Sequence, residues 1–303
     1  MKTEQKNQLH RALWRIRQVE TAIVERYAEQ EMRCPVHLSI GQEAVAVGIC
    51  AHLNEKDYAV SGHRAHAHYL AKGGDLQRMI AEIYGKVTGC CKGRGGSMHL
   101  VDLSVGFLGS TPIVGGSIPV GVGAAFGAKL KKEERVTAIF LGEGATEEGV
   151  FAESLNFASL KKLPILFVCE NNLYSVYSPL SVRQPLSRHL PSLAKAHGII
   201  AFEGDGNRVD EVSEIAQKAV SYIREGNGPV FIELTTYRFH EHCGPNIDPF
   251  QPKEEVAHWS NRDPLRGIEI APSIQEEIDA EIRAAFEFAR SSPFPHLDQE
   301  MYD

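Results

Sequence analysis

The sequence has no long apolar run, no long basic run and no pair of cysteines at the CxxC spacing, and each absence excludes a class of protein. No apolar stretch approaches the roughly 18 residues needed to span a bilayer, and residues 1–10 are polar without an apolar signal core. The formal net charge is -7, which disfavours nucleic acid and anionic membranes as partners. We therefore expect a cytoplasmic protein without a membrane or nucleic-acid partner.

The cysteines argue against a zinc site and for a reducing compartment, because none has metal-binding spacing and the neighbours Cys90 and Cys91 cannot readily bridge each other. No repeat, low-complexity tract or linker-like composition interrupts the 303 residues, so the sequence predicts a single domain, 1–303. The six cysteines are Cys34, Cys50, Cys90, Cys91, Cys169 and Cys243.

The most informative stretch lies between residues 136 and 174. An apolar strand at 136–141 runs into the turn 142–145; a helical pattern follows, stops before Pro164, and gives way to a second apolar strand at 165–169. Two parallel strands joined by a right-handed helical crossover end at the same edge of a sheet. Both turns that follow these strands are therefore expected at the carboxyl edge, where α/β folds bind ligands.

These two turns carry hard oxygen ligands. Glu143 offers a carboxylate, Asn172 an amide oxygen, and the backbone around Tyr174 a carbonyl oxygen, a set that suits Mg²⁺. Gly144 lets a diphosphate approach the amino end of the helix, where N–H groups favour anions. The stretch predicts a Mg²⁺–diphosphate site; a plain βαβ unit with a tight glycine turn is the alternative that the glycines alone leave open.

The remaining pattern alternates strands with helices, with one glycine-rich irregular segment at 86–118 whose apolar residues indicate order. This alternation predicts an α/β fold, a parallel β-sheet flanked by helices on both faces. Strands are predicted at 58–61, 136–141, 165–169, 199–202 and 230–235, and helices at 7–30, 43–53, 75–84, 119–130, 150–160, 187–197, 210–223 and 274–289.

Several histidines and one arginine are further candidates. His63 and Arg64 follow a strand and could bind phosphate oxygens, although a solvated surface pair is the other interpretation. His37 precedes a helix and is either a hydrogen-bond donor to an anion or a packed structural histidine. His240 and His242 end a buried strand; a metal pair is conceivable there, but no third ligand lies near in sequence.

With these motifs, the chain resembles the alpha subunit of the thiamine-diphosphate-dependent decarboxylating component of 2-oxo acid dehydrogenase complexes, of the pyruvate, branched-chain and acetoin types. The resemblance rests on the ordered segments 37–44, 92–100, 143–174 and 237–242. It implies a thiamine-diphosphate-binding fold with an N-terminal helical extension, and it implies thiamine diphosphate and Mg²⁺ as cofactors.

The resemblance also assigns roles to residues. It implies Glu143, Asn172 and Tyr174 as metal ligands, and His37, His66 and His242 as residues of the catalytic pocket. The cofactor-binding residues that it implies are His63, Arg64, Pro112, Val114, Gly142, Gly144, Ala145, Asn172 and His242.

The chain departs from the family pattern at several of these positions. Glu143 stands where the family has Asp, His63 replaces a Tyr, and Pro112 lacks the N–H of other residues. Ser117 stands where Gln is usual, which could mean a different acyl donor or acceptor. Cys243 stands where several mammalian relatives carry a phosphorylated serine.

Partners also follow from the resemblance. In the family, the glutamate that activates the cofactor lies on a separate beta subunit, so we expect an α2β2 assembly that acts on a small 2-oxo acid or acetoin and passes the acyl group to a lipoyl acyltransferase. The small-residue helix 119–130 is a candidate for close interfacial packing. Two alternatives remain: a carboligase subunit of a biosynthetic pathway, and a degenerate noncatalytic partner subunit.

Overall fold

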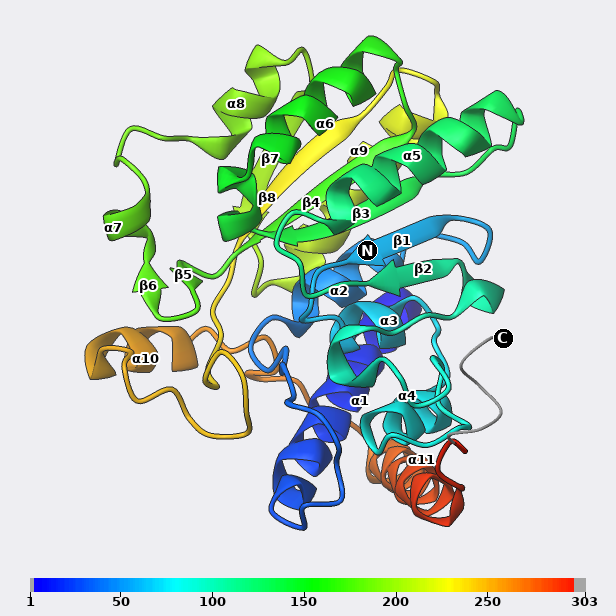
Figure 1. The fold of residues 1–303 in the computed structure, drawn as a ribbon. Coiled ribbons are helices and arrows are strands. Elements are labelled where there is room, and N and C mark those ends of the chain that lie inside the picture. The colour runs from blue at the N-terminus through cyan, green and yellow to red at the C-terminus, as the bar shows by residue number, and fades with distance from the viewer. Residues whose placement is uncertain (1–2, 297–303) are drawn as a thin grey trace.

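A computed structural model describes residues 3–296 and is built around one parallel sheet (Figure 1). The sheet has six strands in the order β2-β1-β3-β4-β8-β7, and every pairing within it is parallel. The predicted fold class is confirmed. The strands are β1 (Tyr58–Ser61), β2 (Phe107–Ser110), β3 (Thr137–Gly142), β4 (Ile165–Asn171), β7 (Ile200–Asp205) and β8 (Val230–Thr235).

Helices cover both faces of this sheet, as Figure 1 shows. The chain also contains a short hairpin of β5 (Tyr174–Ser175) and β6 (Ser178–Pro179), and the 3-10 helix η3 (Glu143–Glu147). The α-helices are α1 (Thr3–Tyr27), α2 (Glu43–Cys50), α3 (His66–Ala71), α4 (Leu76–Ile83), α5 (Ser117–Leu130), α6 (Gly149–Leu160), α7 (Leu180–Arg183), α8 (Leu190–Ala196), α9 (Val209–Arg224), α10 (Lys253–Ser260) and α11 (Pro272–Ser291).

The central strand β4 is buried along its whole length, which explains why its sequence is continuously apolar rather than alternating. Its side chains nevertheless divide between two cores. Leu166 and Val168 belong to the core shared with α1, α2, α4, α9 and α11, whereas Phe167 and Cys169 belong to the core beneath α5, α6 and α8. The sheet is thus the middle layer of three.

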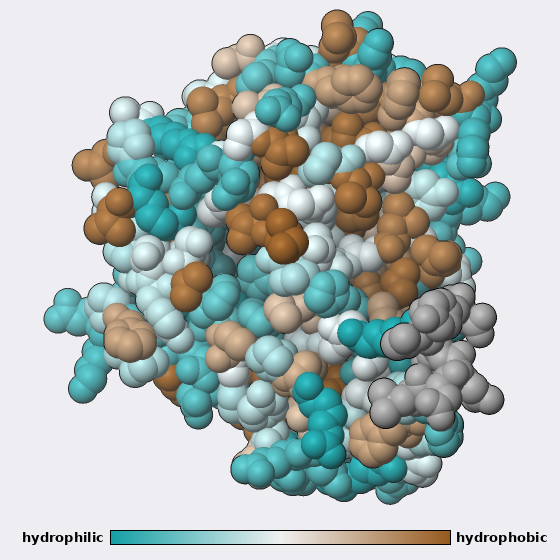
Figure 2. Space-filling view, in the orientation of Figure 1, coloured by the Kyte–Doolittle hydropathy of each residue, from teal (hydrophilic) through white to brown (hydrophobic). Residues whose placement is uncertain are grey.

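Helix α5 packs on β1 and β3 so closely that a glycine is required at the contact. A Cβ atom at Gly121 would lie 2.7 Å from side-chain atoms of Ile139 and 2.8 Å from Val60. This packing offsets the cost of glycine in a helix. The opposite face of α5 is open, with Val120 and Leu130 exposed, and Figure 2 shows hydrophobic residues gathered over this part of the surface.

The glycine-rich segment 86–118 is ordered, and one carboxylate organises part of it. Glu82 is fully buried in α4 and accepts hydrogen bonds from the backbone N–H groups of four residues of the loop. The N···O distances are 2.7 Å to Cys91, 2.9 Å to Gly93, 2.6 Å to Gly95 and 3.1 Å to Gly96. A buried carboxylate that accepts several N–H groups is compensated for its lost hydration.

Of the predicted helices and strands, some are confirmed and others differ in their bounds or were missed. Asp75 caps α4, since its side chain accepts a hydrogen bond from the N–H of Arg78. The first helix ends at Tyr27 rather than residue 30. Strand β2 and helices α3, α7 and α10 were not predicted, because β2 forms by pairing with a strand distant in sequence and these helices are short. All six cysteines are free thiols. Among residues 3–296, no helix is long and apolar enough to cross a membrane.

Candidate functional site

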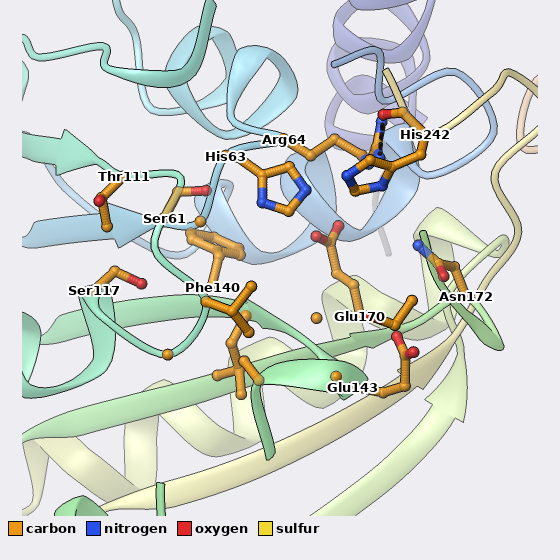
Figure 3. A pocket seen from close by; sticks show the side chains of 18 of the residues that line it. Ser61, His63, Arg64, Thr111, Ser117, Phe140, Glu143, Glu170, Asn172 and His242 are labelled. Carbon is orange, nitrogen blue, oxygen red and sulfur yellow. Dashed lines mark hydrogen bonds between the residues drawn. The ribbon is translucent and has the colours of Figure 1, made fainter. Parts of the chain in front are cut away.

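A cavity opens at the carboxyl ends of β1, β3 and β4, where the sequence predicted ligand binding (Figure 3). Strands β3 and β4 pair in parallel, so the turns that follow them lie at the same edge of the sheet. Ten of the residues to which the resemblance assigns a role line this cavity: His63, Arg64, Val114, Gly142, Glu143, Gly144, Ala145, Asn172, Tyr174 and His242.

Glu143 directly follows β3 and begins η3, with only 2% of the residue exposed. Its carboxylate forms an ion pair with Arg183, which also pairs with Glu147. Burial raises the pKa of Glu143, while the guanidinium of Arg183 lowers it. Arg183 therefore supplies the positive charge that this buried carboxylate requires in the chain without ligands.

Asn172 lies on the same side of the cavity as Glu143 (Figure 3). Its side-chain amide donates to Oε1 of Gln42 at 3.1 Å, and its Oδ1 accepts a hydrogen bond from the N–H of Tyr174 at 3.1 Å. These two hydrogen bonds orient the amide and determine which side its oxygen faces. Gln42 belongs to the segment 37–44, so that segment is tied directly to the turn after β4.

Three histidines from distant parts of the chain meet beside the cavity. The ring centroids of His37, His63 and His242 are separated by 4.9, 5.3 and 5.1 Å, and one ring nitrogen from each lies within 4.8 Å of the others. Burial, followed by the charge of Arg64, lowers the pKa of His37 to about 2, of His63 to about 3 and of His242 to about 4. The cluster is thus neutral at physiological pH.

Arg64 joins the loop that carries His37 to the loop that carries His242. Its Nη1 donates to the carbonyl of Leu38 at 2.6 Å, and its Nη2 donates to the carbonyl of His242 at 3.1 Å. Burial and the charge of Arg238 lower the pKa of Arg64 to about 9. This arginine both holds the loops and places a positive charge at the cavity wall, so it is suited to an anion.

Three of the predicted residues lie elsewhere. Pro112 and His66 are not among the described residues that line the cavity, and His37 reaches it only through its contacts with the other two histidines. His66 is buried between Glu20, 3.1 Å from Nδ1, and Ser97, 2.8 Å from Nε2. Because Ser97 Oγ also accepts from the N–H of His37, His66 supports the His37 loop from behind.

Sequence reasoning missed five polar residues of the site: Gln42, Ser61, His68, Glu170 and Arg183. The first four line the cavity, and Arg183 reaches the Glu143 carboxylate. Gln42 and Glu170 stand inside the motif segments and could have been found there. Arg183 follows no pattern that points to the site. His240 does not join His242; its Nδ1 lies 2.8 Å from the carbonyl oxygen of Pro245.

The donor set fits a metal-bound diphosphate. Glu143 and Asn172 line the same cavity and carry a carboxylate and an amide oxygen, the kinds of ligand that Mg²⁺ prefers. Nδ1 of His37 is buried and has no hydrogen-bond partner among the described residues, and the Arg64 guanidinium lies beside it. An unsatisfied buried nitrogen beside a positive charge is the environment in which a bound anion adds hydrogen bonds.

Comparisons with known proteins identify the family of this chain. The family model for the dehydrogenase E1 component matches residues 11–298. The alpha subunit of acetoin:2,6-dichlorophenolindophenol oxidoreductase from Bacillus subtilis is 37% identical, over 97% of this chain and 93% of the relative. The pyruvate dehydrogenase E1 component subunit alpha is 38% identical in Porphyra purpurea, over 93% of this chain and 88% of the relative. The same subunit of Rickettsia typhi is 34% identical, over 94% and 90%. The chain therefore belongs to the dehydrogenase E1 component family, as an alpha subunit of its thiamine-diphosphate-dependent enzymes.

Proposed function

We propose that this chain supplies the metal and diphosphate half of an active site that decarboxylates a 2-oxo acid or cleaves acetoin. The observation that carries the proposal is the shared cavity of Glu143 and Asn172, with Arg64, His63 and His242 at its wall. Oxygen ligands for a divalent cation and nitrogen donors for an anion meet there at one sheet edge.

The residues take distinct parts in this proposal. Glu143, the side-chain oxygen of Asn172 and the backbone carbonyl of Tyr174 would hold Mg²⁺, while Arg64 and His242 would bind the diphosphate. When bound, thiamine diphosphate supplies the nucleophilic carbon and the electron sink that decarboxylation requires. His63 and His242, both neutral, would each donate one N–H to a phosphate oxygen without adding a full charge.

The second half of the site would come from a beta subunit. We propose that the glutamate that activates the cofactor lies on that subunit, that the assembly is α2β2, and that the acyl group passes to the lipoyl domain of an acyltransferase. The exposed apolar face of α5 and the exposed residues Ile113 and Val114 at the cavity rim support the proposal that the beta subunit covers this surface.

Calorimetry on the chain co-expressed with its beta subunit tests the proposal. We expect saturable binding of thiamine diphosphate that requires Mg²⁺ and is lost in Glu143→Ala. Turnover is then measured with pyruvate, branched-chain 2-oxo acids or acetoin, with lipoamide as acceptor. Acyl transfer to lipoamide separates this function from carboligation, which needs no lipoyl carrier. Wild-type protein that binds no thiamine diphosphate would exclude the assignment.

A further inference from the structure

Two neighbouring thiols lie in the glycine-rich segment 86–118, away from the cavity of the proposed active site. Cys90 is buried and Cys91 is half-buried, and neither is among the described residues that line the cavity. The Sγ atoms of both cysteines and a carboxylate oxygen of Glu82 all lie within 4.8 Å of one another. The pair is therefore a compact cluster of sulfur ligands with one member partly open to solvent.

These two thiols are poorly placed to form a disulfide with each other. The peptide bond that joins Cys90 to Cys91 is trans. Cα atoms across a trans peptide are about 3.8 Å apart, whereas the Cα atoms of an ordinary disulfide are about 4.4–6.8 Å apart. A single atom between the two sulfurs removes this conflict, because each sulfur then bonds to the bridging atom and not to the other sulfur.

The cluster does not suit a divalent metal ion. The carboxylate of Glu82 already accepts hydrogen bonds from four backbone N–H groups, so binding a metal through it would break contacts that hold the loop. Zn²⁺ takes four ligands, and no further His, Cys, Asp or Glu of residues 3–296 joins the group. The pair instead suits a thiophilic atom that needs only two sulfurs from the protein.

Local contacts make Cys91 the more reactive of the two cysteines. The hydrogen bond between the two thiols lowers the pKa of Cys91 and raises the pKa of Cys90, so Cys91 is the one that forms a thiolate, the nucleophilic form. The backbone N–H of Cys91 donates to Glu82 at 2.7 Å, and its Sγ lies 2.8 Å from the carbonyl oxygen of His99. Both contacts fix the position of this residue, so little freedom is lost when a ligand binds.

We propose that Cys90 and Cys91 form a binding site for trivalent arsenic compounds, held by two arsenic–sulfur bonds. The thiolate of Cys91 attacks the arsenic of an arsenoxide, and the thiol of Cys90 then completes the chelate. Two S–H bonds and the arsenic–oxygen double bond are replaced by two S–As bonds, and the oxygen leaves as water with the two thiol protons. Arsenic stays trivalent, so the step needs no oxidant or reductant.

Phenylarsine oxide is the probe, and the intact mass of the chain co-expressed with its beta subunit is the readout. In the presence of excess glutathione, we expect one phenylarsenic group per chain, bound with loss of one water and removed by excess dithiothreitol. The second arsenic–sulfur bond forms within one molecule, so the chelate should resist a monothiol competitor. Cys91→Ser and Cys90→Ala each leave one sulfur and should weaken the apparent affinity by about 100-fold or more.

Cys243→Ser is the matched control. Cys243 is a free, half-buried thiol like Cys91, but it does not belong to the cluster. We expect this variant to bind phenylarsine oxide as the wild type does. Thermal unfolding without the reagent identifies the variants that are folded. Because Cys91 is half-buried, Cys91→Ser keeps the test decisive even where Cys90→Ala, at a buried position, does not fold.

Two results would overturn the inference. One is a wild type that retains no phenylarsenic group in glutathione. The other is binding in folded Cys91→Ser that equals wild-type binding, or a loss in Cys243→Ser that equals the loss in Cys91→Ser, since either assigns the ligand to another thiol. The readout is a mass and not turnover, so a wild type that binds no thiamine diphosphate would remove the proposed function and leave this inference standing.

Discussion

The ion pair between Arg183 and Glu143 makes a sharp prediction about metal affinity. Glu143 is the carboxylate that we assign to Mg²⁺, yet in the chain without ligands Arg183 neutralises it, with 12% of the Arg183 side chain and 2% of the Glu143 side chain exposed. Arg183 Nε also donates to the carbonyl of Ser178 at 3.1 Å, so the hairpin of β5 and β6 is attached to the same contact. A metal ion must displace this guanidinium.

The expected change in Mg²⁺ affinity follows from the charged hydrogen bond between Arg183 and Glu143 that the metal ion replaces. A hydrogen bond to a charged group contributes about 1.5–3 kcal/mol net, which corresponds to roughly 10- to 150-fold in an equilibrium constant. Arg183→Gln removes the competing charge and leaves Glu143 buried without a cation. Since Gln can still hydrogen-bond, we expect the Mg²⁺ affinity of the thiamine-diphosphate complex to rise about 10-fold.

Calorimetric titration of Mg²⁺ into the chain with its beta subunit and excess thiamine diphosphate measures this change. Arg11→Gln serves as control, because it removes an exposed ion pair with Glu277 far from the cavity. If Arg183 instead binds the diphosphate, Arg183→Gln will weaken Mg²⁺ and cofactor binding together. A weaker or unchanged affinity therefore refutes the reasoning.

Two further predictions concern stability. The folded pKa values of His37, His63 and His242 lie below the ordinary value of 6.5, so their contribution to stability is complete above about pH 6.5 and is lost as the pH falls toward 4. Thermal unfolding of the chain without ligands should show a falling Tm over that range, less steep in His63→Gln; a parallel slope would contradict this. Gly121→Ala should destabilise by about 1–3 kcal/mol, because its Cβ would meet Ile139 at 2.7 Å. Gly123→Ala, with nothing within 4 Å, should stabilise by up to about 1 kcal/mol, and equal Tm values for the two would refute the packing argument.

The sequence by itself determined the frame of the site. Apolar runs of strand length separated by a helical pattern predict parallel strands, and parallel strands end at one edge, so Glu143 and Asn172 were placed at one cavity from local pattern alone. The Asp75 cap could also be predicted from the sequence, because it depends on a hydrogen bond within one helical turn.

Only the tertiary structure decided which side chains meet around that frame. Arg183 reaches Glu143 across 40 residues, and His68 of α3 reaches Glu170 of β4. The segments 86–118 and 174–188 have no periodicity to read, because buried carboxylates such as Glu82 and contacts between loops fix them. Backbone periodicity is set by neighbours in sequence, whereas these encounters depend on how distant loops pack, and the partners of each polar group are known only once the chain has folded.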